Sequence, residues 1–197
     1  MTNRTCDTGG REVDLLVDYP RSNRNVDMRG AEKTEVDQAV ARRFGKEFFD
    51  GDRRHGYGGF TYHPRFWQPV VPTFRDFYSL TGESAVLDVG CAKGFMVRDF
   101  KELISGISVN GIDISDYAIG CAEDDIRHDL QVADARELPF DDVSFDLVVS
   151  INTIHNLDRG GVVQALGEIE RVSRSFAYVT VDAYRNEEER ERMMKWN

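Results

Sequence analysis

The chain has 197 residues, of which 41% are hydrophobic, and a formal net charge of −10. This acidic balance disfavours a nucleic-acid-binding protein, because such proteins cluster Lys and Arg against phosphates. A membrane protein is also disfavoured, since no apolar run reaches the roughly 18 residues of a membrane span. The N-terminus has no signal peptide pattern, and the length suits one domain with an N-terminal extension.

The cysteines Cys6, Cys91 and Cys121 are far apart and odd in number. That spacing favours free thiols in a reducing compartment, the cytoplasm, over a disulfide framework. Cys91 is expected to be a small packing residue, with a redox switch as the alternative. The four histidines are scattered, and no cluster of His, Cys and carboxylate residues indicates a metal site.

Residues 1–30 are polar and predict an arm with little structure of its own, apart from one short turn at Leu15–Val17. Residues 31–83 predict a helical and aromatic segment. A helix is expected from Ala31 to Phe49, because apolar residues from Val36 to Phe48 recur every four positions and predict a core-packing stripe. The basic residues between positions 42 and 55 favour a solvated helix face, with a site for an anionic substrate as the alternative.

The stretch Asp50–Pro64 predicts a loop with three glycines and three aromatic residues between Gly56 and Tyr62. Two interpretations have equal weight: a lid over a ligand, or a loop whose rings pack back onto the core. The following segment, Pro64–Leu80, predicts one helix or two pieces divided by Pro72.

From Ser84 onward, strand and helix patterns alternate. This rhythm predicts an α/β domain with a parallel sheet covered by helices on both faces. The expected strands are 85–89, 107–113, 129–133, 144–151 and 176–183, and the expected helices are 94–104, 116–124, 160–173 and 186–196.

The most informative motif is the sequence VLDVGCAKGF at Val86–Phe95. An apolar strand ends there in an acidic residue, and a glycine loop leads into a helix. Glycine lets the backbone approach a ligand closely, and the helix offers unpaired N–H groups. The spacing differs from the G-x-G-x-x-G fingerprint of dinucleotide-binding proteins.

This motif resembles the first motif of class I S-adenosylmethionine (SAM)-dependent methyltransferases, of the type 11/25-like kind. Ala92 replaces the usual middle glycine, which the loop could tolerate if the φ angle there is negative. The resemblance covers about residues 84–184. It implies a Rossmann-like, doubly wound sheet of order 3-2-1-4-5, with SAM as cofactor and S-adenosylhomocysteine (SAH) as product.

The resemblance also assigns site residues. In the first loop these are Asp88, Gly90, Cys91, Ala92 and Gly94, and Asp88 would face the methionyl end of the cofactor. Asp113 would accept hydrogen bonds from both ribose hydroxyls, and Asp134 from the adenine amino group. Ile114 and Leu138 would sandwich the adenine ring, and Ala135 and Ser150 would also contact the cofactor.

Each aspartate alone has a simpler explanation, because loop aspartates commonly cap helices. Together, the three strand-end acids should line one crevice at the carboxyl edge of the sheet. An NAD(P)-dependent oxidoreductase would share Asp113 but would not need Asp134, so it is the less favoured enzyme class.

Methyl transfer needs a general base only if the acceptor must lose a proton. His155 and Tyr57 are the candidates, although a lone loop histidine is more often structural. No Asn/Asp-Pro-Pro-Tyr/Phe signature of amino-methylating enzymes follows the fourth strand, and a small-molecule acceptor is favoured over a macromolecule. The alternative is a non-catalytic SAM-binding scaffold or sensor.

The family resembled closes its sheet with two further strands, whereas this chain stops in a helix pattern at Asn197. We therefore expect that the last two strands are missing from a C-terminally truncated methyltransferase domain, residues 84–197. The oligomeric state stays open, although an exposed fifth strand could pair between two chains.

Overall fold

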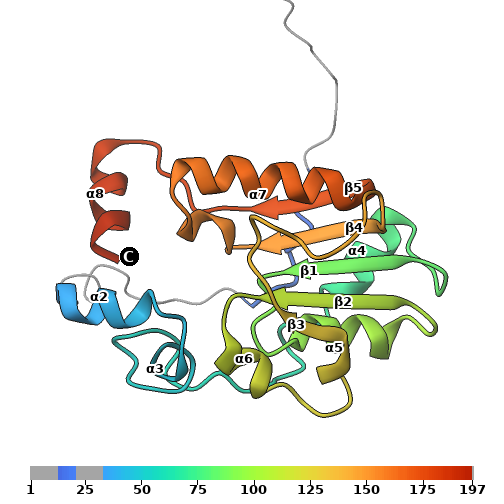
Figure 1. Ribbon diagram of the computed structural model, residues 1–197, viewed down its shortest axis with the longest axis horizontal. Helices are drawn as coiled ribbons and strands as arrows, with labels where there is room; N and C mark the ends of the chain where they lie inside the picture. The colour runs from blue at the N-terminus through green and yellow to red at the C-terminus, as the bar shows by residue number, and fades with distance from the viewer. Residues whose placement is uncertain (1–12, 21–32, 197) are drawn as a thin grey trace, which may run out of the picture.

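The protein is described by a computed structural model over residues 13–20 and 33–196. Five parallel strands form one sheet in the order β3-β2-β1-β4-β5 (Figure 1), which confirms the predicted fold class and strand order. The strands are β1 (Ala85–Val89), β2 (Ser108–Asp113), β3 (Leu130–Val132), β4 (Phe145–Ile151) and β5 (Ser173–Thr180).

Helices precede the sheet and connect most of its strands. They are α2 (Glu35–Ala41), α3 (Lys46–Phe49), α4 (Val71–Tyr78), α5 (Phe95–Leu103), α6 (Asp116–Gly120), α7 (Arg159–Val172) and α8 (Glu187–Trp196), with two 3₁₀ turns, η1 (Arg127–Asp129) and η2 (Ile154–Asn156). No helix formed by the described residues has the length and apolar character of a membrane span.

Two hydrophobic cores cover the two faces of the sheet, because successive strand residues point to opposite sides. Val86 and Leu147 face one core, together with Phe74 of α4 and Phe100 of α5. Leu87, Val89 and Val148 face the other core, together with Ile169 of α7. This double covering leaves the carboxyl ends of the strands as the open edge of the domain.

The predicted helix over Ala31–Phe49 is wrong. Among its described residues, α2 and α3 are separate helices, and the chain breaks at Phe44, whose φ is +48°, before Gly45 caps α3. Thr34 and Asp37 close a capping box at the start of α2. The predicted stripe is not a core face, because Val36 is 71% exposed. The four-residue spacing ignored the bend, which turns Phe44 and Phe48 toward a cavity.

Residues 64–80 are predicted to form one helix or two pieces divided by Pro72, and the structure has a run of turns followed by one helix. Residues 64–70 are turns, and Pro72 lies in the first turn of α4, where its missing N–H costs no hydrogen bond. Helix α6 ends at Gly120 rather than near position 124, and β5 begins at Ser173, directly after α7. Within the described residues no strand follows β5, and Phe176 is exposed on it.

Part of the predicted N-terminal arm packs on the domain. A turn spans residues 15–18, as predicted, and Leu15 is buried in the core next to α4. The ring of Tyr19 lies 4.9 Å from that of Trp67. The rest of the arm, residues 1–12 and 21–30, lies outside the described residues.

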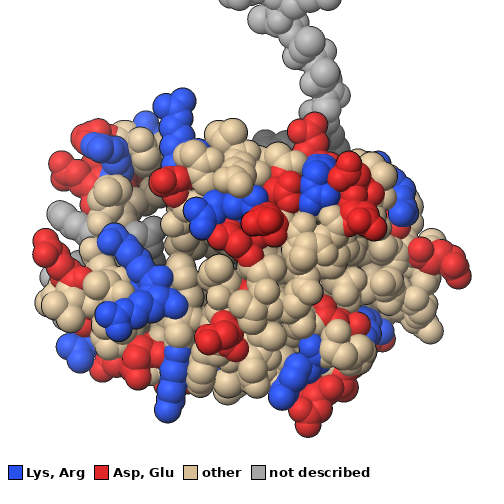
Figure 2. All heavy atoms as spheres, in the orientation of Figure 1, with Lys and Arg blue, Asp and Glu red and all other residues tan. Residues whose placement is uncertain are grey.

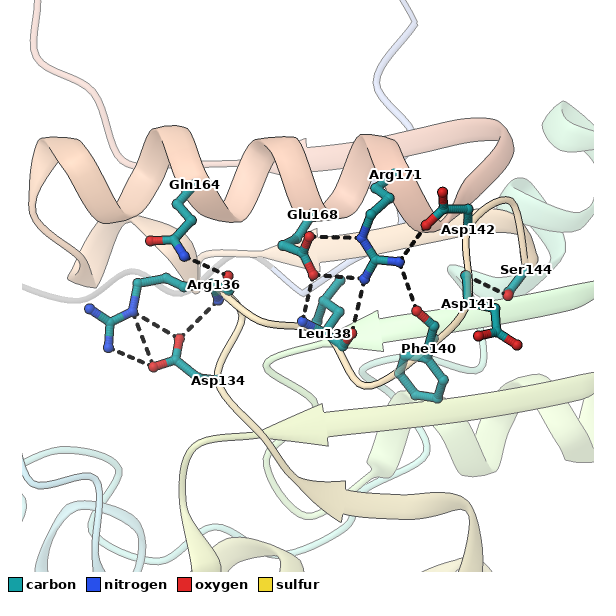
Figure 3. Close-up of polar contacts among 10 residues, drawn as sticks. All are labelled: Asp134, Arg136, Leu138, Phe140, Asp141, Asp142, Ser144, Gln164, Glu168 and Arg171. Atoms are coloured by element: carbon teal, nitrogen blue, oxygen red, sulfur yellow. Dashed lines mark hydrogen bonds and ion pairs between the residues drawn. The ribbon is translucent and has the colours of Figure 1, made fainter.

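An arginine on α7 holds the segment between β3 and β4 in place, as Figure 3 shows. The Arg171 guanidinium donates to the carbonyls of Leu138 (3.0 Å) and Phe140 (2.8 Å) and to the carboxylate of Asp142 (2.8 Å). Glu168 accepts from Arg171 and from the Leu138 N–H, each at 2.8 Å. These contacts replace the crossover helix that this connection lacks.

We expect Arg171→Met to lower the free energy of unfolding by about 2–3 kcal/mol, because it leaves several acceptors without their charged donor. Arg171→Lys should restore little, since one ammonium cannot match the planar fork. Urea denaturation measures both variants. Arg174→Met is the control: it breaks a more exposed pair with Asp146 and should cost less than about 1 kcal/mol. Equal losses in the two methionine variants would contradict this role for Arg171.

Candidate functional site

The loop from Gly90 to Gly94 turns sharply at the end of β1. The N–H groups of Gly90 and Cys91 both donate to the carbonyl of Ile112, at 2.7 and 2.9 Å. The φ angles are +88° at Gly90, +51° at Ala92 and +78° at Gly94. The condition of a negative φ at Ala92, under which the loop would tolerate the loss of the usual glycine, is therefore not met, and the left-handed backbone there has a steric cost.

A cavity of about 740 Å³ opens beside this loop. One wall consists of the ends of β1, β2 and β3 and the residues after β4. The other wall consists of the segment from Arg42 to Trp67, which we call the lid segment, with Leu16 and Tyr19 beside it. Small-molecule sites commonly have such volumes.

Eight of the ten predicted cofactor residues line the cavity: Asp88, Gly90, Cys91, Ala92, Asp113, Ile114, Asp134 and Ala135. The sequence motif thus predicted the wall formed by the strand ends. Cys91 is buried, and burial raises the pKa of its thiol well above the ordinary value, as befits a packing residue.

Two predicted cofactor residues do not line the cavity. Gly94 packs toward β3, where a Cβ atom would come within 2.6 Å of Leu130. Ser150 does not face the cavity, because side chains alternate along the strand and Ile151 is the residue that lines it. Ser150 is fully buried, and its hydroxyl has no hydrogen-bond partner among the described residues. Leu138, expected beside the adenine ring, is buried in the α7 core instead.

The Asp88 carboxyl is the unusual group of this wall. It is 6% exposed, lines the cavity and has no hydrogen bond to any described residue. Burial and the nearby charge of Asp113 raise its pKa to about 7. A buried, unpaired carboxyl facing a cavity fits a cationic ligand group, which would satisfy it.

Asp113 supports the loop and faces the same space. One oxygen accepts from the Ala92 N–H and the other from the Ser115 N–H, both at 2.8 Å. Burial raises the pKa of this carboxyl. Each oxygen keeps a second lone pair, so a pair of ligand hydroxyls can still be bound.

The third strand-end acid is engaged by a neighbour. Both oxygens of Asp134 accept from Arg136, with contacts as short as 2.6 Å, and this pairing lowers the pKa of Asp134. Figure 3 shows the pair at the edge of the segment that Arg171 fixes. Ile114, 55% exposed, offers apolar surface nearby.

His155, predicted as a candidate base, is not among the residues that line the cavity. Its neighbours Ile154 and Asn156 line the cavity, but the His155 ring faces the chain after β5. There, Nδ1 accepts from the N–H of Asp182 at 3.3 Å. The loop pattern identified the right segment, but the 3₁₀ turn η2 rotates this side chain outward.

The aromatic residues of the lid segment have features of both interpretations, since their rings line the cavity and also pack on one another and on α5. Tyr57 and Phe60 line the cavity, and their rings also pack on each other at 4.3 Å. Phe60 stacks on Phe95 at 4.9 Å, directly after the glycine loop. These rings form part of the cavity wall and fix the lid segment to α5.

A partly buried ion pair, which sequence reasoning missed, joins the lid segment to the glycine loop. The Lys93 ammonium donates to both oxygens of Asp50 (2.7 and 3.0 Å) and to the Phe60 carbonyl (2.7 Å). Asp50 also accepts from the Phe60 N–H and the Tyr117 hydroxyl. Position 93 showed only a lysine inside the loop, and nothing local pointed to its partner 43 residues earlier.

Three basic residues from the stretch 42–55, for which the sequence left an anionic-substrate site as the alternative, lie on the lid wall, whereas sequence reasoning missed His63 and Arg65 there. His63 lines the cavity, and its Nδ1 accepts from the Arg65 N–H at 3.2 Å. Four arginines line the same wall: Arg42, Arg43, Arg53 and Arg65. Among the described residues, no three or more His, Cys, Asp or Glu side chains come together as a metal site would require.

Residues 87–181 match the family model described as a methyltransferase domain. This segment supports the resemblance of the chain to class I SAM-dependent methyltransferases. The chain is 32% identical over 94 residues to 27-O-demethylrifamycin SV methyltransferase of Amycolatopsis mediterranei (strain S699), a match covering 44% of this chain and 34% of that one.

A protein of Encephalitozoon cuniculi (strain GB-M1) with a provisional methyltransferase name is 35% identical over 136 residues, which are 66% of this chain and 57% of the relative. The chain therefore spans less than two thirds of these curated relatives. A crystallised protein of Pyrococcus horikoshii OT3 has 28% identity and a TM-score of 0.48, with 55% of this chain and 54% of that one covered.

We expect Ala92→Gly to raise the free energy of unfolding of this protein by about 1 kcal/mol, because glycine adopts φ of +51° without a Cβ clash. Urea denaturation measures the change. The matched control is Ala118→Gly inside α6, where the same substitution should lower stability by about 1 kcal/mol. A loss of stability at position 92 would rule out a strained alanine there.

A second prediction concerns pH. The Asp88 pKa is about 7 in the folded protein and near its ordinary 3.8 when unfolded, so the folded state binds the extra proton between these values. This group therefore lowers stability as pH rises toward 7. Asp88→Asn should gain about 2–4 kcal/mol at pH 8 and much less at pH 5.

Urea denaturation of the unliganded protein at the two pH values measures the difference. Asp141→Asn, which changes an exposed aspartate, serves as the control and should change stability little at either pH. An equal effect of Asp88→Asn at both pH values would refute the raised pKa.

Proposed function

We propose that this protein transfers a methyl group from SAM to a small-molecule acceptor. The observation that carries the proposal is the unpaired, buried carboxyl of Asp88 beside Asp113, at the wall of a cavity of about 740 Å³. In a class I methyltransferase domain, the methionyl ammonium and the ribose hydroxyls of the cofactor need hydrogen-bond acceptors at these strand ends. A cytoplasmic setting, which keeps Cys91 and Cys121 reduced, belongs to the same proposal.

The residues on the strand wall fit the cofactor group by group. Asp88 would accept from the methionyl ammonium, which supplies the partner that this carboxyl lacks. Asp113 would use its remaining lone pairs for the two ribose hydroxyls, and Ile114 and Ala135 would contact the adenine ring. When bound, the cofactor supplies a methyl group already activated on a sulfonium sulfur.

The lid wall would position the acceptor. Its rings, including Tyr57 and Phe60, leave a space suited to a small apolar body rather than to a polymer. The protein must hold the accepting atom about 3–3.5 Å from the methyl carbon, in line with the bond that breaks. The outward position of His155 means that an acceptor would not depend on this histidine to lose a proton.

Asp113→Asn should weaken SAH binding at least about tenfold, because an amide is uncharged and cannot accept at both positions. Calorimetry at pH 7.5 measures this, and thermal melts confirm that the variant is folded. Asp116→Asn, which removes an exposed carboxylate three residues later, is the control and should leave SAH affinity unchanged.

The same titrations separate the alternatives. If neither SAM nor SAH binds but NADH does, the domain is an oxidoreductase and the proposal fails. If SAM binds tightly and a broad panel of small molecules yields neither SAH nor a methylated product, a SAM-binding scaffold or sensor replaces the enzyme.

A further inference from the structure

Most of the charges that line the cavity are divided by sign between its two walls; the exception is Arg136, which lies on the strand wall and pairs with Asp134. The carboxylates Asp88, Asp113 and Asp134 all belong to the strand wall. The lid wall contributes Arg42, Arg43, Arg53 and Arg65, and no aspartate or glutamate of the lid segment lines the cavity. This concentration of positive charge is unexpected in a chain whose net charge is −10.

Two acidic residues of the lid segment are bound by other basic residues. Asp50 is bound by Lys93, and Asp52 pairs with Arg54, which does not line the cavity. Neither Arg43 nor Arg65 forms an ion pair or a side-chain hydrogen bond with any described residue. The Arg65 guanidinium lies 4.8 Å above the ring of Phe66, which leaves its N–H donors available.

Aromatic rings on the lid wall indicate that a ligand bound beside the arginines also has an apolar part. The rings of Phe48, Tyr57, Phe60 and Trp67 line the same wall as the arginines. Figure 2 shows a group of Lys and Arg side chains near α2, at the left of the molecule. An arginine fork binds carboxylates and phosphates through paired hydrogen bonds, while aromatic faces bind a flat apolar body.

The cofactor alone cannot neutralise this wall. SAM carries one carboxylate against an ammonium and a sulfonium, so its binding adds a net positive charge to the cavity. The two guanidinium groups of Arg43 and Arg65, on one wall of a partly desolvated site, therefore call for a second, negatively charged ligand.

We infer that the methyl acceptor is a small organic anion, with a carboxylate or phosphate ester group bound by Arg43 and Arg65 and an apolar body against the aromatic rings of the lid segment. This inference rests on the proposed function and names its substrate class. The anionic group orients the acceptor by binding the arginines of the lid wall. The carboxylates of the strand wall repel this anionic group, so the acceptor and the cofactor occupy opposite sides of the cavity.

The test uses the full chain loaded with SAH, whose binding is first established by calorimetry. Benzoate and phenyl phosphate are the anionic probes, and benzamide is the neutral match for benzoate. We expect at least one anion to bind the SAH complex at least about tenfold more tightly than benzamide. The preference between the two anions distinguishes a carboxylate acceptor from a phosphate ester.

The double variant Arg43→Ala/Arg65→Ala should lose that affinity by at least about tenfold and retain SAH binding within about twofold. Arg54→Ala, which removes one positive charge from the same segment outside the cavity, is the control and should leave both affinities unchanged. Melting temperatures establish that all variants are folded.

Three results overturn the inference while the proposed function stands. These are SAH binding with no anion binding, equal binding of benzoate and benzamide, and anion affinity that Arg54→Ala reduces as much as the double variant. If the double variant loses SAH instead of the anion, the arginines hold the cofactor's carboxylate. If SAH does not bind the unaltered protein, the proposed function itself is refuted.

Discussion

The partly buried ion pair between Lys93 and Asp50 joins two parts of the chain that would otherwise be separate. Removing an ammonium and a carboxylate from water is costly unless each finds enough partners. Here each oxygen of Asp50 accepts two hydrogen bonds, and Lys93 also reaches the carbonyl of Phe60. Because the lysine is part of the glycine loop, the position of the lid segment is tied to the position of the loop. The cavity exists between these two parts.

The two walls of the cavity differ in how they are built. The strand wall follows from backbone geometry: parallel strands end at one edge, so the acids that terminate them converge. The lid wall follows from side chains, through ring packing and the ion pair of Lys93. Asp88 and Asp113 are kept close together at the expense of a raised pKa for each. Such a cost at a cavity is typical of a ligand site rather than of a structural core.

The sequence predicted the strand wall well because its signals are local. Apolar runs ending in Asp88 and Asp113 fix both the strand and the place where it stops, and the alternation after Ser84 fixes the parallel sheet. Other predictions failed where a single backbone torsion or a contact between distant residues determines the local structure. The left-handed Phe44 ends a helical pattern, and η2 turns His155 away while its neighbours stay at the cavity. The partner of Lys93 lies far along the chain, so no spacing rule could identify it.

No linking residue separates α7 from β5, since the helix ends at Val172 and the strand begins at Ser173. The carbonyls of Arg171 and Val172 also accept the N–H groups of Val143 and Ser144, which lead into β4. Helix, strands and the segment bearing Asp134 are thus one rigid unit with no slack. The lid segment has no comparable connection to the sheet backbone. Substitutions before β1 can therefore reshape the lid wall while the strand wall keeps its geometry.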